Sequence, residues 1–227
     1  MVTTTPKRKP GRPARTDVDA SAIIRTAALN VFAQKGFDRA SIVDIANAAN
    51  VAKPLIHYHY ATKDALWQAA VSQAQLALMA ELMSVQGLLS NLKPLQSIEL
   101  LSKKLIEFAA HHPQLVRIVV DETGKGGPRA EWLFEQFLLP SYALSRVMIE
   151  KVSKDLKLGA RKPKVEHLVP TVLGVMYFPF LESGVIQRAY GKDVYSPGYI
   201  QRQSEVLHKV LLSFFVPLNV SSYTRLS

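Results

Sequence analysis

The stretch SIVDIANAANVAKPLIHYHYATK (Ser41–Lys63) predicts two short helices joined by a tight turn. Ser41 is a candidate helix N-cap, and Asp44 three residues later completes the pattern of a capping box. Asn50 stands where the turn needs a left-handed backbone, which Asn adopts more readily than most residues that carry a side chain. Pro54 suits the first turn of the second helix, where an N–H group has no helical partner. With the amphipathic helix pattern that precedes them, these elements predict a helix-turn-helix.

The second of these helices has an inner and an outer face. At about 100° per residue, Ile56 and Tyr60 fall together on the side that would face the core. The outer face offers hydrogen-bond donors and flat rings without any acidic residue, and it consists of Lys53, Pro54, His57 and Tyr58. Such a face suits contacts with phosphate oxygens and with base edges in a DNA groove.

Two neighbouring residues, Lys63 and His59, need separate consideration. Lys63 begins the next helix, where its ammonium group and the first backbone amides would both suit a phosphate. His59 would either contact DNA or pack between helices. His57 and His59 lie about 200° apart around the helix, so they cannot bind one metal ion together, and the adjacent pair His111–His112 has the same problem. No metal site and no cofactor are predicted.

The net charge of +10 is concentrated in the first quarter of the chain. Residues 1–63 contain ten Lys or Arg and four Asp or Glu, and the first sixteen residues contain five basic residues and no acid. This placement indicates a polyanionic partner, and a disordered basic tail would show the same composition. The absence of cysteine excludes disulfides and thiolate zinc sites and fits a reducing, cytoplasmic location.

The basic arm contains the sequence RKPGRPAR (Arg8–Arg15), which looks like an AT-hook core. Its prolines favour an extended strand, and Gly11 has no side chain to clash with a groove wall. Arg12, with Arg15 close by, would therefore reach a narrow A·T minor groove. A purely electrostatic role for a disordered tail is the alternative. No apolar run follows the basic residues, so no secretory signal is predicted.

Beyond Lys63 the helical periodicity continues, without any run of the alternating pattern that is typical of strands. Helices are predicted at about 63–89, 95–112, 113–122, 129–157, 164–188 and 197–216. Pro140 should kink or split the helix at 129–157. The most apolar window, His167–Ile186, is interrupted by Pro170, Gly174 and Pro179, so we expect a buried helix there and no membrane partner.

The sequence therefore predicts an all-α protein with a three-helix helix-turn-helix head joined to a larger helical bundle. The expected boundaries are a disordered basic arm at 1–17, the head at 18–63, the bundle at 64–217 and a tail at 218–227. No catalytic motif such as Gly-x-Ser-x-Gly or His-Glu-x-x-His is present, so an enzyme is not expected.

The bundle has more apolar side chains than one layer of helices needs. The larger ones could line a cavity between helices or form an ordinary core; they are Phe108, Trp132, Phe134, Phe137, Tyr142, Met148, Met176, Tyr177 and Phe180. A second set lies on helices that are apolar on more than one side, so that one side could pack against a symmetry mate. This set consists of Leu168, Val172, Val175 and Phe178 in one helix and Val206, Val210, Leu211 and Phe214 in the other.

The segment Ile23–Val71 resembles the N-terminal DNA-binding domain of the TetR family of bacterial transcriptional repressors. The positions that follow the family pattern are Ala27-Ala28, Phe32, Gly36-Phe37, Ser41, Ile45-Ala46, Val51, Ile56, Tyr58, His59-Tyr60 and Lys63-Asp64-Ala65-Leu66. Three positions depart from it. Asn50 replaces the usual Gly, and Ala52 replaces the Ser or Thr that caps the recognition helix, at a cost of about 1 kcal/mol. His57 replaces a Tyr whose hydroxyl contacts phosphate, so this contact would depend on pH.

The resemblance implies partners and a set of site residues. The residues expected to line the DNA are Ser41, Lys53, Pro54, His57, Tyr58, His59 and Lys63. The bundle would enclose a small, hydrophobic effector, and its last two long helices would pair with those of a second subunit as a four-helix bundle. The expected function is a homodimeric repressor that an effector releases from operator DNA. An architectural or weakly specific DNA-binding protein without an effector is the alternative.

Overall fold

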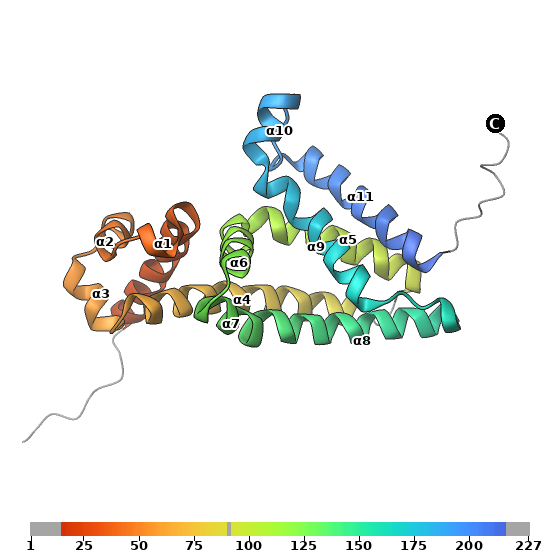
Figure 1. Cartoon of the computed structure of the whole chain (residues 1–227), viewed down its shortest axis with the longest axis horizontal. Helices are drawn as coiled ribbons and strands as arrows, with labels where there is room; N and C mark the ends of the chain where they lie inside the picture. The colour runs from red at the N-terminus through yellow and green to blue at the C-terminus, as the bar shows by residue number, and fades with distance from the viewer. Residues whose placement is uncertain (1–14, 90–91, 217–227) are drawn as a thin grey trace, which may run out of the picture. The chain divides into compact units, whose positions relative to one another are not determined.

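Helices make up all the regular secondary structure in residues 15–89 and 92–216, the part of the chain that this computed structural model describes (Figure 1). The all-α prediction is therefore confirmed. The chain divides into an N-terminal unit, Met1–Gln73, and a C-terminal unit, Ala74–Ser227. The helix α4 (Lys63–Leu89) begins in the first unit and continues into the second.

The N-terminal unit consists of α1 (Arg15–Arg39), α2 (Ile42–Ala49), α3 (Lys53–His59) and the start of α4. Local sequence sets the breaks between these helices. Gly36 interrupts the helical backbone at φ 74°, a conformation that favours glycine. Asn50 adopts the left-handed conformation predicted for the turn, with φ 52° and ψ 46°. Ala52 provides no side-chain cap for α3, and a proline occupies the first turn of that helix.

Apolar side chains from all four helices form the core of this unit. The largest fully buried ones are Ile24, Phe32, Ile45, Ile56, Leu66 and Trp67. Phe37 connects two of the layers, since its ring stacks on Phe32 with centroids 5.7 Å apart and meets Trp67 edge-on at 6.4 Å. Aromatic pairs in these arrangements add to the free energy of burial, so the short helices α2 and α3 are held by packing rather than by their own length.

The capping box at the start of α2 is present and is extended by a cation. The backbone N–H of Asp44 donates to Ser41 Oγ at 3.0 Å, and the backbone N–H of Ser41 donates back to the Asp44 carboxylate at 3.0 Å. The Lys35 ammonium lies 2.7 Å from the same carboxylate. The hydrogen bond from Lys35, followed by those from Ser41, lowers the pKa of Asp44 from 3.8 to about 2.

We expect the stability of the N-terminal unit to depend on the ionisation of Asp44 at low pH. Because its folded-state pKa of about 2 lies below the unfolded value, this stabilisation is present above about pH 4 and is lost as the pH falls toward 2. Carboxyl NMR should give a midpoint for Asp44 near 2 in the native chain and a midpoint shifted toward 3.8 in Lys35→Ala. Identical titrations of the two chains would show that Lys35 has no such effect.

The C-terminal unit contains, after α4, the helices α5 (Pro94–His111), α6 (Pro113–Lys125), α7 (Pro128–Leu133), α8 (Leu139–Asp155), α9 (Val165–Leu181), α10 (Ser183–Tyr190) and α11 (Pro197–Phe215). Proline begins α5, α6, α7 and α11, because its fixed φ suits the first turn and its missing N–H is not needed there. The helix α11 packs on α5 and α9, and α9 also contacts α6 and α8 (Figure 1).

Two prolines inside helices leave backbone carbonyls that neighbouring helices satisfy. Pro140 cannot donate to the carbonyl of Gln136, four residues earlier, and the Gln75 side chain on α4 donates to that carbonyl instead. Pro179 in α9 likewise leaves the carbonyl of Val175 free, and Gln203 Nε2 on α11 donates to it at 2.9 Å. Each proline therefore creates a point of attachment between helices.

These prolines also account for the helix breaks. The predicted helix at 129–157 is split as expected, because a π-helical turn at Phe134–Leu138 separates α7 from α8 just before Pro140. The single helix predicted at 164–188 is wrong: α9 ends at Leu181, and α10 continues after a 67° bend. Among the described residues no single helix is long and apolar enough to cross a membrane, and the bent pair α9 and α10 passes a test of length and composition only when the two are joined.

A buried ion pair closes the turn between α6 and α7. Glu122, 2 % exposed, lies at the end of α6, and Arg129 Nε donates to its carboxylate at 2.8 Å. The chain reverses between them through Gly126 and Gly127, whose φ angles of 73° and 89° favour glycine. Burial of a charge is tolerated only when it is paired, so this pair fixes where α7 begins.

Candidate nucleic-acid interface

The helix α3 separates its buried and exposed residues as the helical wheel predicts. Ile56 is 0 % exposed and fixes the helix against the core. The four residues of the predicted outer face, Lys53, Pro54, His57 and Tyr58, are all exposed, and Tyr58 reaches 75 %. The segment Lys53–His59 contains no acidic residue. The structure therefore presents donors and an aromatic ring to solvent on a helix whose other side is fixed.

His59 occupies a more enclosed position than its neighbours. Its ring meets Tyr58 edge-on with centroids 5.1 Å apart and lies 6.2 Å from the ring of Tyr60. Its Nε2 atom is buried without a hydrogen-bond partner among the described residues. Of the two alternatives for His59, packing between helices and contact with DNA, the structure shows packing. A contact between His59 and DNA stays a prediction.

Lys63 and Ser41 are both engaged inside the unit. Lys63 Nζ lies 4.4 Å from the centre of the Phe37 ring and donates to the carbonyl of Asp38 at 3.3 Å. Ser41 is exposed, but its hydroxyl accepts the capping hydrogen bond from the Asp44 N–H. An ammonium group has three N–H donors, so Lys63 can hold Asp38 and still donate to a phosphate.

Replacing Lys63 by alanine should weaken binding to every DNA sequence and lower the salt slope by about 1, because one phosphate contact is lost. Dissociation constants measured between about 50 and 200 mM salt test this. Since Lys63 also covers Phe37, Lys63→Met is the matched variant that keeps the aliphatic stem and removes the charge. A native salt slope in both variants would remove Lys63 from the interface.

A polar network that sequence reasoning missed holds the end of α3. Arg25 Nη1 donates to the Tyr60 hydroxyl at 3.2 Å and to Ser21 Oγ at 2.6 Å, and its Nε donates to Gln73 on α4. The hydroxyls of Tyr60 and Ser21 are themselves 2.8 Å apart. The helical wheel placed Tyr60 on the side that faces the core and did not predict a hydrogen bond for its hydroxyl. The sequence signal for the network was that Ser21 and Arg25 lie one turn apart on α1. The network connects α1, α4 and the residue that follows α3.

Sequence comparison assigns the N-terminal unit. Residues 24–70 match the family of bacterial regulatory proteins described as the tetR family, and this segment contains α2, α3 and most of the core described above. Residues 24–70 therefore form a segment of the tetR type. No curated protein gives a sequence match to the chain.

Solved structures of regulators share the fold over most of the chain at low identity. A TetR-like transcriptional regulator from Rhodococcus sp. RHA1 aligns over 91 % of this chain and 100 % of its own length, with 18 % identity and a TM-score of 0.61. A fatty acid degradation regulator from Bacillus halodurans covers 87 % of this chain and 99 % of its own, with 14 % identity and a TM-score of 0.60. The transcriptional regulator FadR from Bacillus subtilis in complex with stearoyl-CoA covers 87 % and 99 %, with 12 % identity and a TM-score of 0.57.

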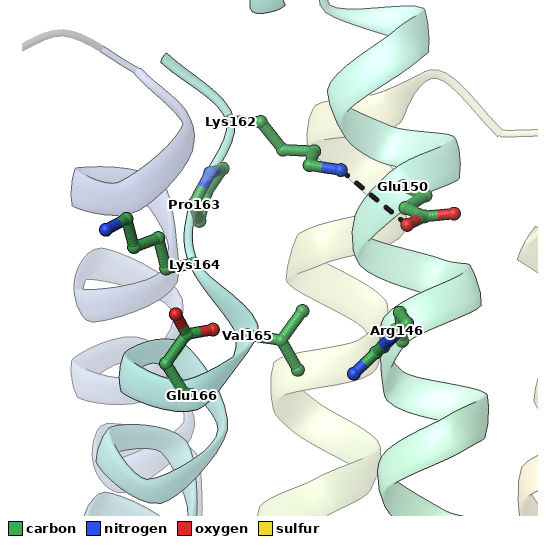
Figure 2. Close-up of a pocket in the computed structure, with 7 residues that line it drawn as sticks. All are labelled: Arg146, Glu150, Lys162, Pro163, Lys164, Val165 and Glu166. Atoms are coloured by element: carbon green, nitrogen blue, oxygen red, sulfur yellow. Dashed lines mark ion pairs between the residues drawn. The ribbon is translucent and has the colours of Figure 1, made fainter. Parts of the chain in front are cut away.

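The side chains predicted to line a ligand pocket differ in exposure. Phe108, Phe137, Met176 and Phe180 are buried, and Phe134 is 48 % exposed. Tyr142 and Tyr177 pack against the core cluster that contains Met176 and Phe180, and Trp132 and Met148 are half-buried. A pocket of about 280 Å³ lies instead between α8 and the start of α9 (Figure 2), and none of the predicted residues is among those that line it.

The residues predicted for a subunit interface fall into two groups. Leu168 and Leu211 are 2 % and 5 % exposed and belong to the core of their own unit, so they face inward rather than toward a partner. The residues with at least partial exposure are Val172, Val175, Phe178, Val206, Val210 and Phe214. Phe178 and Val206 are 63 % and 46 % exposed. A subunit interface through the remaining residues stays a prediction.

The basic arm lies outside what the structure describes. Arg12 precedes the described residues, and Arg15 is the first residue of α1, with its side chain outside the description. Within the described residues no group of three His, Cys, Asp or Glu side chains is arranged to hold a metal ion.

Proposed function

We propose that this TetR-family chain binds double-stranded operator DNA as a homodimer and represses transcription until a small hydrophobic effector releases it. The observation that carries the proposal is the outer face of α3, where Lys53, His57 and Tyr58 are exposed while Ile56 on the opposite side is fully buried. A helix held in this way can enter a major groove with its donors toward phosphates and base edges. The protein acts in the cytoplasm, at the nucleoid.

A dimer explains how such a short helix achieves specificity. Two copies of α3 would read two half-sites about 34–36 Å apart, one turn of DNA, in a pseudo-palindromic operator. Exposed apolar side chains on α9 and α11, Phe178 and Val206 among them, support a partner surface on these helices. The basic arm, with Arg12 and Arg15, would add contacts in a flanking minor groove.

The effector is proposed to be a fatty acyl compound. The support is that a structure of this fold is a fatty acid degradation regulator and another was solved with stearoyl-CoA. The C-terminal unit also has a large apolar core, which includes Met176 and Phe180 and against which Tyr142 and Tyr177 pack. Release from DNA requires the effector to bind the two states of the protein unequally, by an amount that is typically about 1–3 kcal/mol.

The decisive experiment is selection of genomic fragments by the full-length protein, repeated in the presence of fatty acids, acyl-CoA esters and unrelated small molecules. A ligand-responsive repressor should select a pseudo-palindrome that it prefers over bulk DNA by about a thousandfold or more, and one class of compound should abolish the selection. A small preference that no compound changes would favour the alternative, an architectural DNA-binding protein without an effector.

A further inference from the structure

A basic turn connects α8 to α9 and is fixed to the core at two points. The segment Leu156–Lys164 carries four cations and no acid: Lys157, Arg161, Lys162 and Lys164, all exposed. Two residues after the end of α8, Lys157 adopts a φ of 54°. The N–H of Leu158 donates back to the carbonyl of Ser153 at 3.0 Å, which is the hydrogen bond of a Schellman motif. Leu158 is 7 % exposed within the core cluster, and Pro163 is buried.

This anchoring decides where the cations lie. With Leu158 and Pro163 inside, the polar residues between and after them are held at the surface next to α8. Residues in a left-handed conformation that are not glycine cost free energy and are often found at functional sites, and Lys157 is one of two such residues in the described part of the chain. The backbone of the turn therefore has a defined conformation that fixes the positions of its cations.

The turn forms one wall of the pocket in Figure 2. The pocket has a volume of about 280 Å³ and is lined by Arg146 and Glu150 of α8, by Lys162–Lys164 of the turn, and by Val165 and Glu166 at the start of α9. Lys162 reaches across the pocket toward α8 and lies 3.6 Å from Glu150, and Arg146 projects into the same gap beside Val165. Three cations and two carboxylates leave the lining with a net positive charge.

The pocket also adjoins the apolar interior of the unit. Val165 packs against the core cluster, as do Tyr142, one helical turn before Arg146 on α8, and Tyr177 on α9. Burial, with a smaller contribution from Tyr142, raises the pKa of Tyr177 well above its usual value, so the Tyr177 phenol stays neutral. The charged side chains of the pocket thus lie next to aromatic and apolar side chains of α8 and α9 that pack against the core.

We propose that this pocket binds the phosphate-bearing, anionic head group of the effector. The inference rests on the proposed function and adds to it the place and chemistry of the head group. A guanidinium and an ammonium from separate elements suit a phosphate, which accepts several charge-assisted hydrogen bonds. The Glu150 carboxylate, 3.6 Å from Lys162 Nζ, offsets part of the positive charge of the lining.

A surface that binds DNA would arrange its cations differently from those of this pocket. A DNA backbone is tracked by cations spread along an exposed stripe, whereas Arg146 and Lys162 face each other across a hollow with an apolar floor at Val165. That arrangement favours a small amphipathic molecule.

The test is calorimetric titration of the full-length protein with palmitoyl-CoA and, separately, with palmitate, which has a carboxylate and no phosphate. In the variant Arg146→Gln/Lys162→Gln we expect the Kd for palmitoyl-CoA to rise about tenfold or more, because two charge-assisted contacts are lost, and the Kd for palmitate to change less. The control is Lys151→Gln/Lys154→Gln, which removes two exposed charges of α8 that do not line the pocket and should leave both constants unchanged.

Three outcomes with the pocket variant would overturn the inference. The first is a native Kd for palmitoyl-CoA in the pocket variant, which would show that the head group of this effector class binds at another site. The second is an equal loss for palmitate and palmitoyl-CoA, which would make the site one for a carboxylate. The third is a loss of operator affinity as large as the loss of palmitoyl-CoA affinity, which would assign these cations to DNA. If the wild-type protein binds its operator but neither compound, the inference and the proposal of a fatty acyl effector are both wrong. The proposal of a DNA-binding regulator is not affected by that result.

Discussion

Replacing Arg129 by alanine is expected to lower the free energy of unfolding of the C-terminal unit by about 3 to 5 kcal/mol, because it leaves the Glu122 carboxylate buried without its partner. Glu122 is 2 % exposed and lies at the end of α6, where the chain must reverse into α7. Urea unfolding measures the effect. Trp132 in α7 reports on this unit once Trp67, the other tryptophan of the chain, is replaced by phenylalanine in both proteins.

The control separates the buried charge from the loss of side-chain packing. In Glu122→Gln/Arg129→Met neither member is charged, so most of the stability lost in Arg129→Ala should return. Equal destabilisation of the single and the double variant would show that packing of Arg129, and not the uncompensated carboxylate, dominates. A loss below about 1 kcal/mol in Arg129→Ala would mean that water reaches Glu122 and stabilises it.

The second large effect is expected on DNA binding alone. Lys53→Ala/Tyr58→Ala should reduce operator affinity by about a hundredfold, since a phosphate contact and a base contact together contribute roughly 2 to 4 kcal/mol. The melting temperature should stay the same, because both side chains are exposed and Tyr58 reaches 75 %. Fluorescence anisotropy with operator and with unrelated DNA measures the two affinities.

The single variants separate the phosphate contact from the base contact in the expected loss of operator affinity. Lys53→Ala should weaken both DNAs alike, whereas Tyr58→Ala should weaken operator more than unrelated DNA if its ring touches base edges. Lys209→Ala, an exposed lysine on α11, is the matched control and should change neither affinity. Native operator affinity in the double variant would refute the assignment of α3 as the reading helix.

The elements that sequence predicted well are those set by a few adjacent residues. The capping box at Ser41, the left-handed turn at Asn50 and the proline in the first turn of α3 each depend on local backbone chemistry, and all three are present. The helical wheel also separated Ile56 from Tyr58, because a short helix lying on a core has one buried side. These features depend only on residues that are close in sequence, so they can be predicted without knowing which helices meet.

What sequence could not predict depends on which helices meet. A helix that is apolar on several sides does not reveal which side faces its own chain, so Leu168 and Leu211 were expected at a subunit interface and lie in the core instead. The hydroxyl of Tyr60 and the guanidinium of Arg25 come from distant positions and meet only in the fold. The charged pocket beside α8 was missed for the same reason, since Arg146 and Lys162 belong to different elements.

The two glutamines that reach carbonyls freed by proline carry an implication for reading relatives of this protein. Gln75 serves the Gln136 carbonyl only because Pro140 cannot, so a chain that lost the proline could lose the glutamine without penalty. The positions in each pair, Gln75 with Pro140 and Gln203 with Pro179, should therefore covary across the family. C-terminal helical units too divergent to align by motif could be placed in register by these two couplings.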